Sequence, residues 1–491
     1  MTGTSVKGVG KDMLLYVPGR AIPAVVQILT VTALTYFFAG EEIGRYELTF
    51  RFVLFLSTCT FFWLSMTILR FYPAYAVKNQ EDVFFGVIGL LKYASIGVGF
   101  AVGGLAYFLG PDVIFGSFRD LIGVGLLMFA AYTLYEIGLI VLRAKRRPGL
   151  YSIATTTNAA LRLPLAILLF TAFGFGISGM LWALAIMYAV VYVVLVRRFV
   201  GRPQFRLDNE GRTLLREVLH YGLPVWGIQL LNYFIMSSDR YLLDALQDTR
   251  AVGLYAVACN LIDQPMWLVF QTFTLAVFPT VAHCWETEGR GAAEALVGGV
   301  TRLFFLLCVP LLALLSVLAQ PIFHVLARHE SVQAYVAAPY VATAAFLYGM
   351  SYFANMGLHL AKKTRLLLMM TLIALSANVA MNFLLIPQFS FIGAASARII
   401  SNTVLVIAVA AAGHRYLHWR VPLKSVLRIG IAAAAAGLAA YFAKGYVPTN
   451  VFTLAGLFAA GGLVYGAVLL GLGEFTLAEL RSGFGLLKRR E

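Results

Sequence analysis

The sequence predicts an all-α membrane protein of about fourteen transmembrane helices, and two observations carry this prediction. Hydrophobic residues make up 60% of the chain and charged residues only 12%, whereas a soluble domain carries about 25% charged residues because water must wet its surface. Apolar stretches of about 20 residues, the length that crosses a bilayer, recur along the whole chain. Because no water satisfies backbone amides inside hydrocarbon, such stretches form helices.

The predicted helices follow one another with short connections, and the longest polar segment covers residues 197–219. The predicted spans are 12–39, 46–72, 83–109, 119–142, 150–172, 175–196, 220–243, 252–282, 297–327, 333–360, 366–386, 391–413, 425–443 and 451–473. An even number of spans places both termini on the same side of the membrane.

The placement of positive charge assigns that side to the cytoplasm. Most of the 38 Lys and Arg residues fall in segments on the side of the termini, and the opposite side receives Arg45, Arg119, Arg250, Arg328 and Lys444. Positive residues are retained in cytoplasmic loops, so both termini are expected to be cytoplasmic. The net charge of +15 does not indicate nucleic-acid binding, because the basic residues sit in short loops beside anionic lipid headgroups.

Two parts of the chain resemble each other in register. Tyr16-Val17-Pro18 near the first span is matched by Tyr221-Gly222-Leu223-Pro224 near the seventh, and Ile43-Gly44-Arg45-Tyr46 is matched by Val252-Gly253-Leu254-Tyr255. Six spans separate the members of each pair, so both copies cross the membrane in the same direction. This pattern predicts a parallel repeat, which is typical of two-lobed transporters with a substrate path between the lobes.

The repeat divides the chain into five predicted parts. They are an N-terminal lobe over 1–196 with helices 1–6, a basic cytoplasmic linker over 197–219, a C-terminal lobe over 220–418 with helices 7–12, helices 13 and 14 over 419–473, and an amphipathic cytoplasmic tail over 474–491.

Several segments carry a resemblance to a known family: Tyr221-Gly222-Leu223-Pro224, Asp239-Arg240-Tyr241-Leu242-Leu243, Val252-Gly253-Leu254-Tyr255, Phe278-Pro279-Thr280, Ala361-Lys362-Lys363-Thr364, and Asn378 through Gly393. The chain resembles the polysaccharide-export (Wzx-type) branch of the superfamily that holds multidrug extruders, lipid II flippases and oligosaccharidyl-lipid flippases. The resemblance implies movement of an undecaprenyl-pyrophosphate-linked repeat unit between the leaflets of a bacterial cytoplasmic membrane, for export of a surface polysaccharide. A polysaccharide polymerase and a chain-length regulator are candidate partners.

Basic side chains inside the spans are the candidate substrate site. A charge at the bilayer centre costs about 2.5–3.5 kcal/mol, so each one needs a reason. Arg162 lies near the middle of its span, and Arg20, Lys92 and Arg398 lie a third to halfway in. Arg51 is nearer the outer face, where snorkelling is the alternative. We expect these cations to line a cavity for pyrophosphate, whose oxygens Arg matches with several donors. Structural ion pairing is the alternative.

Acidic and amide residues are the candidates for ion coupling. The resemblance to lipid II flippases implies a sodium site at Asp239, Asn378 and Asn382, and Asn378 and Asn382 share a helix face. Plain interhelical hydrogen bonding is the alternative. Asp263 is an alternative proton-coupling carboxylate, and Glu136 is expected to pair with Arg162 or Lys92. Because Asp239 and Arg240 are adjacent, we expect them to point to different helix faces.

Two other functions remain as rivals. A small-molecule antiporter of the same fold would need an acidic cavity for cationic drugs. A membrane-embedded glycosyltransferase or polymerase would need catalytic clusters in a large outer loop. The sequence contains no phosphate-cradling glycine loop, so ATP use and a tightly bound cofactor are not expected, although Na⁺ or H⁺ coupling is.

Overall fold

The computed structural model describes residues 18–200, 209–361 and 363–474, and these residues form helices and short connections without a β-strand. The chain divides into two compact units, Met1–Ala256 and Val257–Glu491, each considered by itself below. The predicted tail over 475–491 and the Tyr16-Val17 part of the first repeat motif lie outside the described residues.

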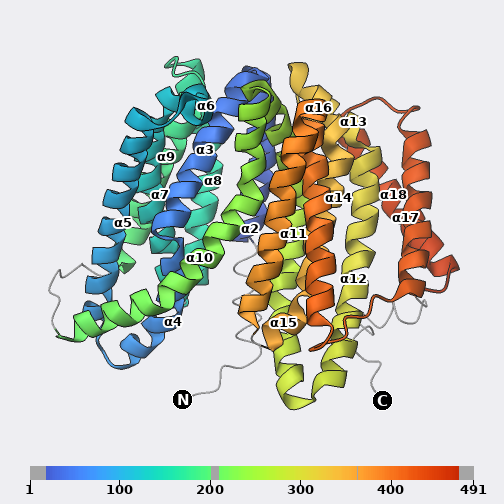
Figure 1. The fold of residues 1–491 in the computed structure, drawn as a ribbon. Coiled ribbons are helices and arrows are strands. Elements are labelled where there is room, and N and C mark those ends of the chain that lie inside the picture. The colour runs from blue at the N-terminus through green and yellow to red at the C-terminus, as the bar shows by residue number, and fades with distance from the viewer. Residues whose placement is uncertain (1–17, 201–208, 362, 475–491) are drawn as a thin grey trace. The chain divides into compact units, whose positions relative to one another are not determined.

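The first unit is built from membrane-length helices with short 3-10 and π-helical pieces (Figure 1). They are α2 (Pro18–Phe37), α3 (Gly40–Thr60), α4 (Phe62–Val77), α5 (Glu81–Leu109), α6 (Asp112–Phe115), η1 (Gly116–Leu121), α7 (Ile122–Ala144), α8 (Pro148–Thr171), α9 (Ser178–Val191), the π-helical η2 (Tyr192–Val196), η3 (Arg197–Phe199), α10 (Asn209–Leu246) and the start of α11 (Thr249–Thr287). The unit therefore holds the predicted first lobe together with the seventh span.

The second unit begins inside α11 and contains the remaining helices. They are α12 (Arg290–Val317), α13 (Ala319–Leu326), η4 (His329–Ala337), α14 (Ala338–Ala354), α15 (Met356–Leu360), α16 (Thr364–Gly413), α17 (Leu423–Ala443) and α18 (Val451–Gly471). The carboxylate of Glu474 accepts a hydrogen bond from Arg302 Nε at 2.6 Å and approaches Arg428 at 3.4 Å. These contacts join α12 and α17 to the end of α18.

Within the described residues, each of the fourteen predicted spans falls on one or more helices. Among the described residues, nine helical segments are long and apolar enough to cross a membrane, and the pair α3 and α4, bent by 43°, makes ten. The other four spans fall on α2, whose apolar part is short, on α10, which carries charged residues, on the 17-residue α14, and on the second arm of α16. The predicted all-α membrane fold is confirmed.

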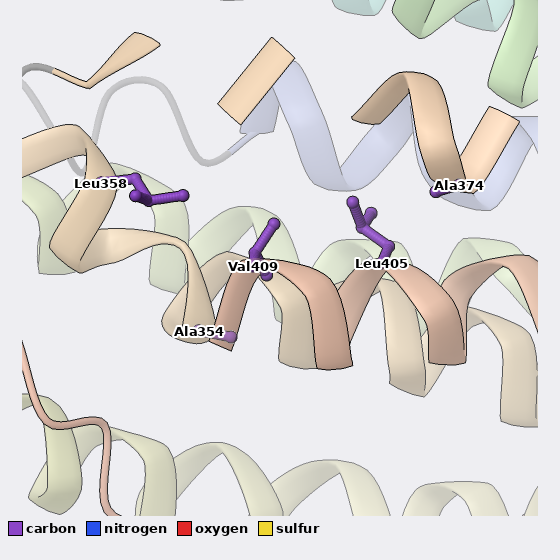
Figure 2. Close-up of a cluster of buried hydrophobic side chains, with 5 residues drawn as sticks. All are labelled: Ala354, Leu358, Ala374, Leu405 and Val409. Atoms are coloured by element: carbon purple, nitrogen blue, oxygen red, sulfur yellow. The ribbon is translucent and has the colours of Figure 1, made fainter. Parts of the chain in front are cut away.

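Helix α16 is two antiparallel arms joined at a sharp break. Ser390 has φ 49° and ψ −131°, far from helical geometry. The arms lie against each other, because Ala374 on the first packs with Leu405 and Val409 on the second. Figure 2 shows these side chains gathered with Ala354 of α14 and Leu358 of α15. A Cβ on Gly393 would overlap the carbonyl oxygen of Leu385, so only glycine allows the chain to turn back so closely.

Candidate functional site

Arg162 is the deepest predicted cation, and its partners are neutral. Its Nη2 lies 3.3 Å from Gln27 Oε1 of α2, and its guanidinium lies near the Tyr188 side chain of α9. The Nε atom is buried and has no hydrogen-bond partner among the residues that the structure describes. Because a buried unsatisfied donor costs free energy, this guanidinium retains an unused capacity to bind an anion.

The residues on the opposite side of α8 show which way Arg162 points. Leu163, Pro164 and Ile167 of α8 line an apolar groove with Val26 and Leu29 of α2, and the groove has a volume of about 580 Å³. Successive residues of a helix are about 100° apart, so Arg162 lies on the side of α8 away from the groove. The groove suits lipid, and Arg162 points into the unit.

Glu136 does not form the predicted ion pair. In the described part of the chain no salt bridge joins this carboxylate to Arg162 or to Lys92. Glu136 instead lies on α7 beside Tyr132 and Tyr135, whose rings are 5.1 and 5.0 Å from the ring of Tyr188. The structure brings neither expected partner to Glu136, because Arg162 bonds with Gln27 and Lys92 lies against aromatic rings.

Lys92 is buried in the first unit rather than displayed to solvent. Only 3% of its surface is exposed. Its Nζ lies 4.5 Å from the centre of the Tyr93 ring and 6.0 Å from that of Tyr192, where the π-helical η2 begins. Cation–π contacts of this kind stabilise a desolvated ammonium. Arg20 lies in α2, but its side chain is outside the described part of the structure.

Arg51 belongs to a buried network of four charged residues from α3 and α10. Its Nη2 is 2.7 Å from Glu47 Oε1, the same oxygen that accepts from Arg240 Nε at 2.9 Å. Arg240 Nη1 is 3.0 Å from Asp239 Oδ1, and Asp239 Oδ2 accepts from the Tyr255 hydroxyl at 2.7 Å. We call Glu47, Arg51, Asp239 and Arg240 the charge network.

The charge network corrects the expectation that Asp239 and Arg240 point apart. Asp239 Oδ1 accepts from both the backbone N–H of Arg240 and its Nη1, each at 3.0 Å, while Nη1 also donates to the Met236 carbonyl at 3.1 Å. The long arginine side chain folds back along its own helix toward the N-terminus, as helical side chains tend to do. Adjacent residues can therefore meet even though their Cβ atoms diverge.

In the second unit, two predicted residues form one ion pair. Arg398 of α16 lies 2.7 Å from Asp263 Oδ2 of α11, with 15% and 23% of the two side chains exposed. The other oxygen, Asp263 Oδ1, is buried and finds no hydrogen-bond partner within the described part of the chain. Arg398 is therefore ion-paired with a carboxylate. Structural ion pairing was the alternative that the sequence left open for this residue.

Asn378 and Asn382 also lie together, as their spacing predicts. Asn382 Nδ2 donates to Asn378 Oδ1 at 2.9 Å, and Asn378 Nδ2 donates across the α16 hairpin to Ser401 Oγ at 3.2 Å. Both amides are buried, and none of the described residues donates a hydrogen bond to Asn382 Oδ1. A buried amide oxygen without a donor is the kind of ligand that a hard cation prefers.

Three residues that sequence reasoning missed complete these sites: Glu47, Tyr255 and Ser401. Glu47 could have been found, because it precedes Arg51 by four residues, the spacing of a helical ion pair. Tyr255 and Ser401 carry no such local signal. They approach Asp239 and Asn378 only through tertiary packing.

Comparison with known proteins shows what parts of this chain are similar to. The profile of a family described as "Polysaccharide biosynthesis protein" matches residues 120–329. A probable lipid II flippase of Haemophilus influenzae is 28% identical over 55% of this chain and 57% of its own length. An uncharacterized membrane protein of Methanocaldococcus jannaschii is 23% identical over 80% of both chains.

Solved structures extend the likeness to almost the whole chain. The lipid II flippase MurJ in an inward closed conformation has a TM-score of 0.74 at 14% identity, covering 94% of this chain and 98% of its own. The chain has the fold of the multidrug/oligosaccharidyl-lipid/polysaccharide (MOP) exporter superfamily. A multidrug resistance transporter of the same superfamily, in an inward-facing conformation, has a TM-score of 0.61 at 14% identity over 82% of this chain and 97% of its own.

The likeness confirms, at the level of the fold, the resemblance predicted from the sequence. The chain is a multi-pass membrane protein, and its named relatives are flippases and transporters rather than enzymes. The glycosyltransferase or polymerase alternative is therefore set aside.

Proposed function

We propose that this chain is a flippase for undecaprenyl-pyrophosphate-linked oligosaccharide repeat units. It would move them from the inner to the outer leaflet of a bacterial cytoplasmic membrane, with both of its termini in the cytoplasm, for assembly of a surface polysaccharide. The observation that carries the proposal is Arg162, a guanidinium deep in a membrane helix whose partners Gln27 and Tyr188 are neutral and whose Nε is unsatisfied. Such a group is suited to a desolvated phosphate.

The rest of the path follows from the chemistry of the substrate. The pyrophosphate would bind at Arg162, the glycan would pass through a hydrated interior, and the polyprenyl tail would stay in the bilayer. Membrane lipids, and a polymerase that receives the flipped unit, are the expected partners. Lys92 and Arg398 have less capacity for the substrate, because one is buried among tyrosines and the other is held by Asp263. Arg20 remains a predicted contact.

Coupling to an ion gradient is part of the proposal. In the second unit, the orphan oxygen of Asn382 beside Asn378 supports a sodium ligand set. Asp263 is the proton alternative, since its protonation would release Arg398 from the ion pair. Asp239 already accepts bonds from Arg240 and Tyr255, so sodium would have to compete with a guanidinium there.

The test uses a strain that lacks the protein and is complemented by variants. Arg162→Ala removes the charge, Arg162→Lys keeps the charge but loses the planar fork, and Arg212→Ala is a matched control at an exposed site in α10. A hydrogen bond to a charged group is worth about 1.5–3 kcal/mol, so Arg162→Ala is expected to lower export about tenfold or more.

The readouts are the lipid-linked repeat unit and the surface polymer, with protein abundance measured in the membrane. We expect the lipid-linked unit to accumulate in Arg162→Ala cells, a smaller accumulation with Arg162→Lys, and wild-type behaviour with Arg212→Ala. Unchanged polymer together with higher sensitivity to cationic drugs in the deletion strain would instead identify the small-molecule antiporter.

A further inference from the structure

We propose that α3 and the first turn of α11 form a gate, and that the charge network is a latch released when a phosphate takes Arg51 from Glu47. The inference rests on the proposed function for the identity of the phosphate. In this proposal the Glu47 carboxylate binds Arg51 as long as no substrate phosphate is bound.

The gate is a close crossing of two glycine-containing helix ends within the first unit. A Cβ on Gly44 would overlap the carbonyl oxygen of Thr249, and a Cβ on Gly253 would overlap that of Gly40. Small residues four apart on each helix allow the two backbones to touch, as in membrane helix pairs generally.

The crossing is reciprocal, and this relates it to the repeat. Gly40 and Thr249 are as far apart in the sequence as Gly44 and Gly253, so each of these two pairs occupies matching positions of the repeat. Gly44 contacts Thr249, which matches Gly40, and Gly253 contacts Gly40, which matches Thr249. A self-complementary contact of this kind is the signature of a local two-fold axis. A transporter with parallel repeats that alternates its access must open such a symmetric contact on one side.

Polar contacts surround the crossing and close it. Asp244 of α10 accepts from Thr249 Oγ1 at 2.6 Å and from Ser117 Oγ at 2.7 Å, and the Ser117 carbonyl accepts from Arg45 Nε at 3.0 Å. Asp248 accepts from the Ala251 N–H at 2.7 Å and caps α11. Helices α3, α10 and α11 are thereby tied to η1 at the same end of the unit.

The latch lies one helical turn below the crossing. Glu47 follows Gly44 on α3, Asp239 and Arg240 come from α10, and Tyr255 follows Gly253 on α11. Glu47, Asp239 and Arg240 are 4%, 2% and 4% exposed. Separation of α3 from α10 and α11 would break the Glu47–Arg240 pair, so the latch favours the closed crossing.

Charge balance explains how a phosphate would release the latch. The two carboxylates and two guanidiniums of the charge network cancel. Arg51 is its accessible member, with 20% of its side chain exposed. A phosphate that captured Arg51 would leave two buried carboxylates with one guanidinium, and an uncompensated buried charge destabilises the arrangement that buries it. The closed crossing would therefore weaken when substrate binds.

The test measures access to a reporter below the crossing. Ala256→Cys, a small change on α11 at a site that is 1% exposed, is placed in the full chain after Cys59, Cys259, Cys284 and Cys308 are replaced by Ala. A membrane-impermeant maleimide is applied from the outer face, the face predicted for residues 40–45. The variants are Glu47→Gln, which weakens the latch, and Gly44→Ala, which forces the crossing apart.

Gly97→Ala is the matched control, because nothing lies within 4 Å of a Cβ at that helical glycine. We expect Glu47→Gln and Gly44→Ala each to raise the labelling rate about fivefold or more, with Gly97→Ala unchanged. Undecaprenyl pyrophosphate is expected to raise labelling in the otherwise wild-type reporter and to add little in Glu47→Gln.

The outcomes separate the gate from the proposed function. If neither Glu47→Gln nor Gly44→Ala changes labelling, the gate is wrong, whether or not the protein flips lipid-linked glycans. If both variants raise labelling but undecaprenyl pyrophosphate has no effect, the gate stands and the phosphate trigger at Arg51 is wrong, while the substrate class is decided by the Arg162 export assay. Gly44→Ala keeps the test decisive if Glu47→Gln fails to accumulate.

Discussion

At the scale of single residues, the basic side chains inside the membrane fall into two groups. Arg51, Arg240 and Arg398 each touch a carboxylate, whereas Arg162 and Lys92 have amide or aromatic partners. Each cation of the first group is neutralised by a carboxylate in this structure, and of the three only Arg51 is proposed to exchange that carboxylate for a phosphate. Arg162 differs because its unsatisfied Nε gives an incoming anion a reason to bind.

The Asp263–Arg398 pair predicts a measurable coupling. Asp263→Asn leaves Arg398 partly buried without its counter-charge, and we expect a loss of about 1–3 kcal/mol of stability, less than for a fully buried pair because both side chains keep some exposure. Arg398→Met in the same chain should restore part of that loss. Thermal unfolding of the purified single and double variants gives the coupling, and strictly additive effects would show that the pair stabilises nothing.

At the scale of elements, the break in α16 shows what the sequence could and could not predict. Two spans with a boundary between 386 and 391 are legible from hydropathy and from Pro387. The sequence does not predict the backbone conformation of the break, because this conformation places Ser390 in a region that favours glycine. Tertiary packing of the two arms, through Ala374 and Leu405, holds this geometry against its local cost.

Ser390→Gly is therefore expected to stabilise the second unit. Glycine adopts φ 49° without the steric cost that serine carries, so the gain should be about 1 kcal/mol. The midpoint of thermal unfolding in detergent should rise, while Ser390→Ala, which keeps the Cβ, should not raise it. A lower midpoint for the glycine variant would mean that the serine side chain contributes more than the strain costs.

At the scale of the whole molecule, composition and hydropathy suffice for the helical membrane fold, because the bilayer admits few alternatives to helices. The repeat motifs place Gly44 and Gly253 at matching positions, and the structure brings Gly44 against Thr249 and Gly253 against Gly40. The partners of the deep charges were less predictable. Glu47 and Asp263 capture arginines that the sequence left for substrate, since ion pairing is decided by packing rather than by depth in a span.

Sodium binding is the prediction that concerns energy coupling. If the orphan Asn382 oxygen binds sodium, Na⁺ should stabilise the wild-type protein against heating more than equimolar K⁺, by mass action on the folded state. Asn382→Leu, which removes the oxygen at similar volume, should abolish the difference, while Asp263→Asn should leave it intact. Equal stabilisation by both cations would contradict the sodium site and leave Asp263 as the coupling residue.

Direct transport in a defined membrane tests the central claim. The purified protein is reconstituted into vesicles with an undecaprenyl-pyrophosphate-linked oligosaccharide, and the fraction of glycan accessible to an added glycosidase is followed over time. We predict that wild-type protein and the Arg212→Ala control expose glycan from the protected leaflet, and that Arg162→Ala does so at least about tenfold more slowly. If wild-type vesicles expose glycan no faster than protein-free vesicles, the flippase assignment is contradicted.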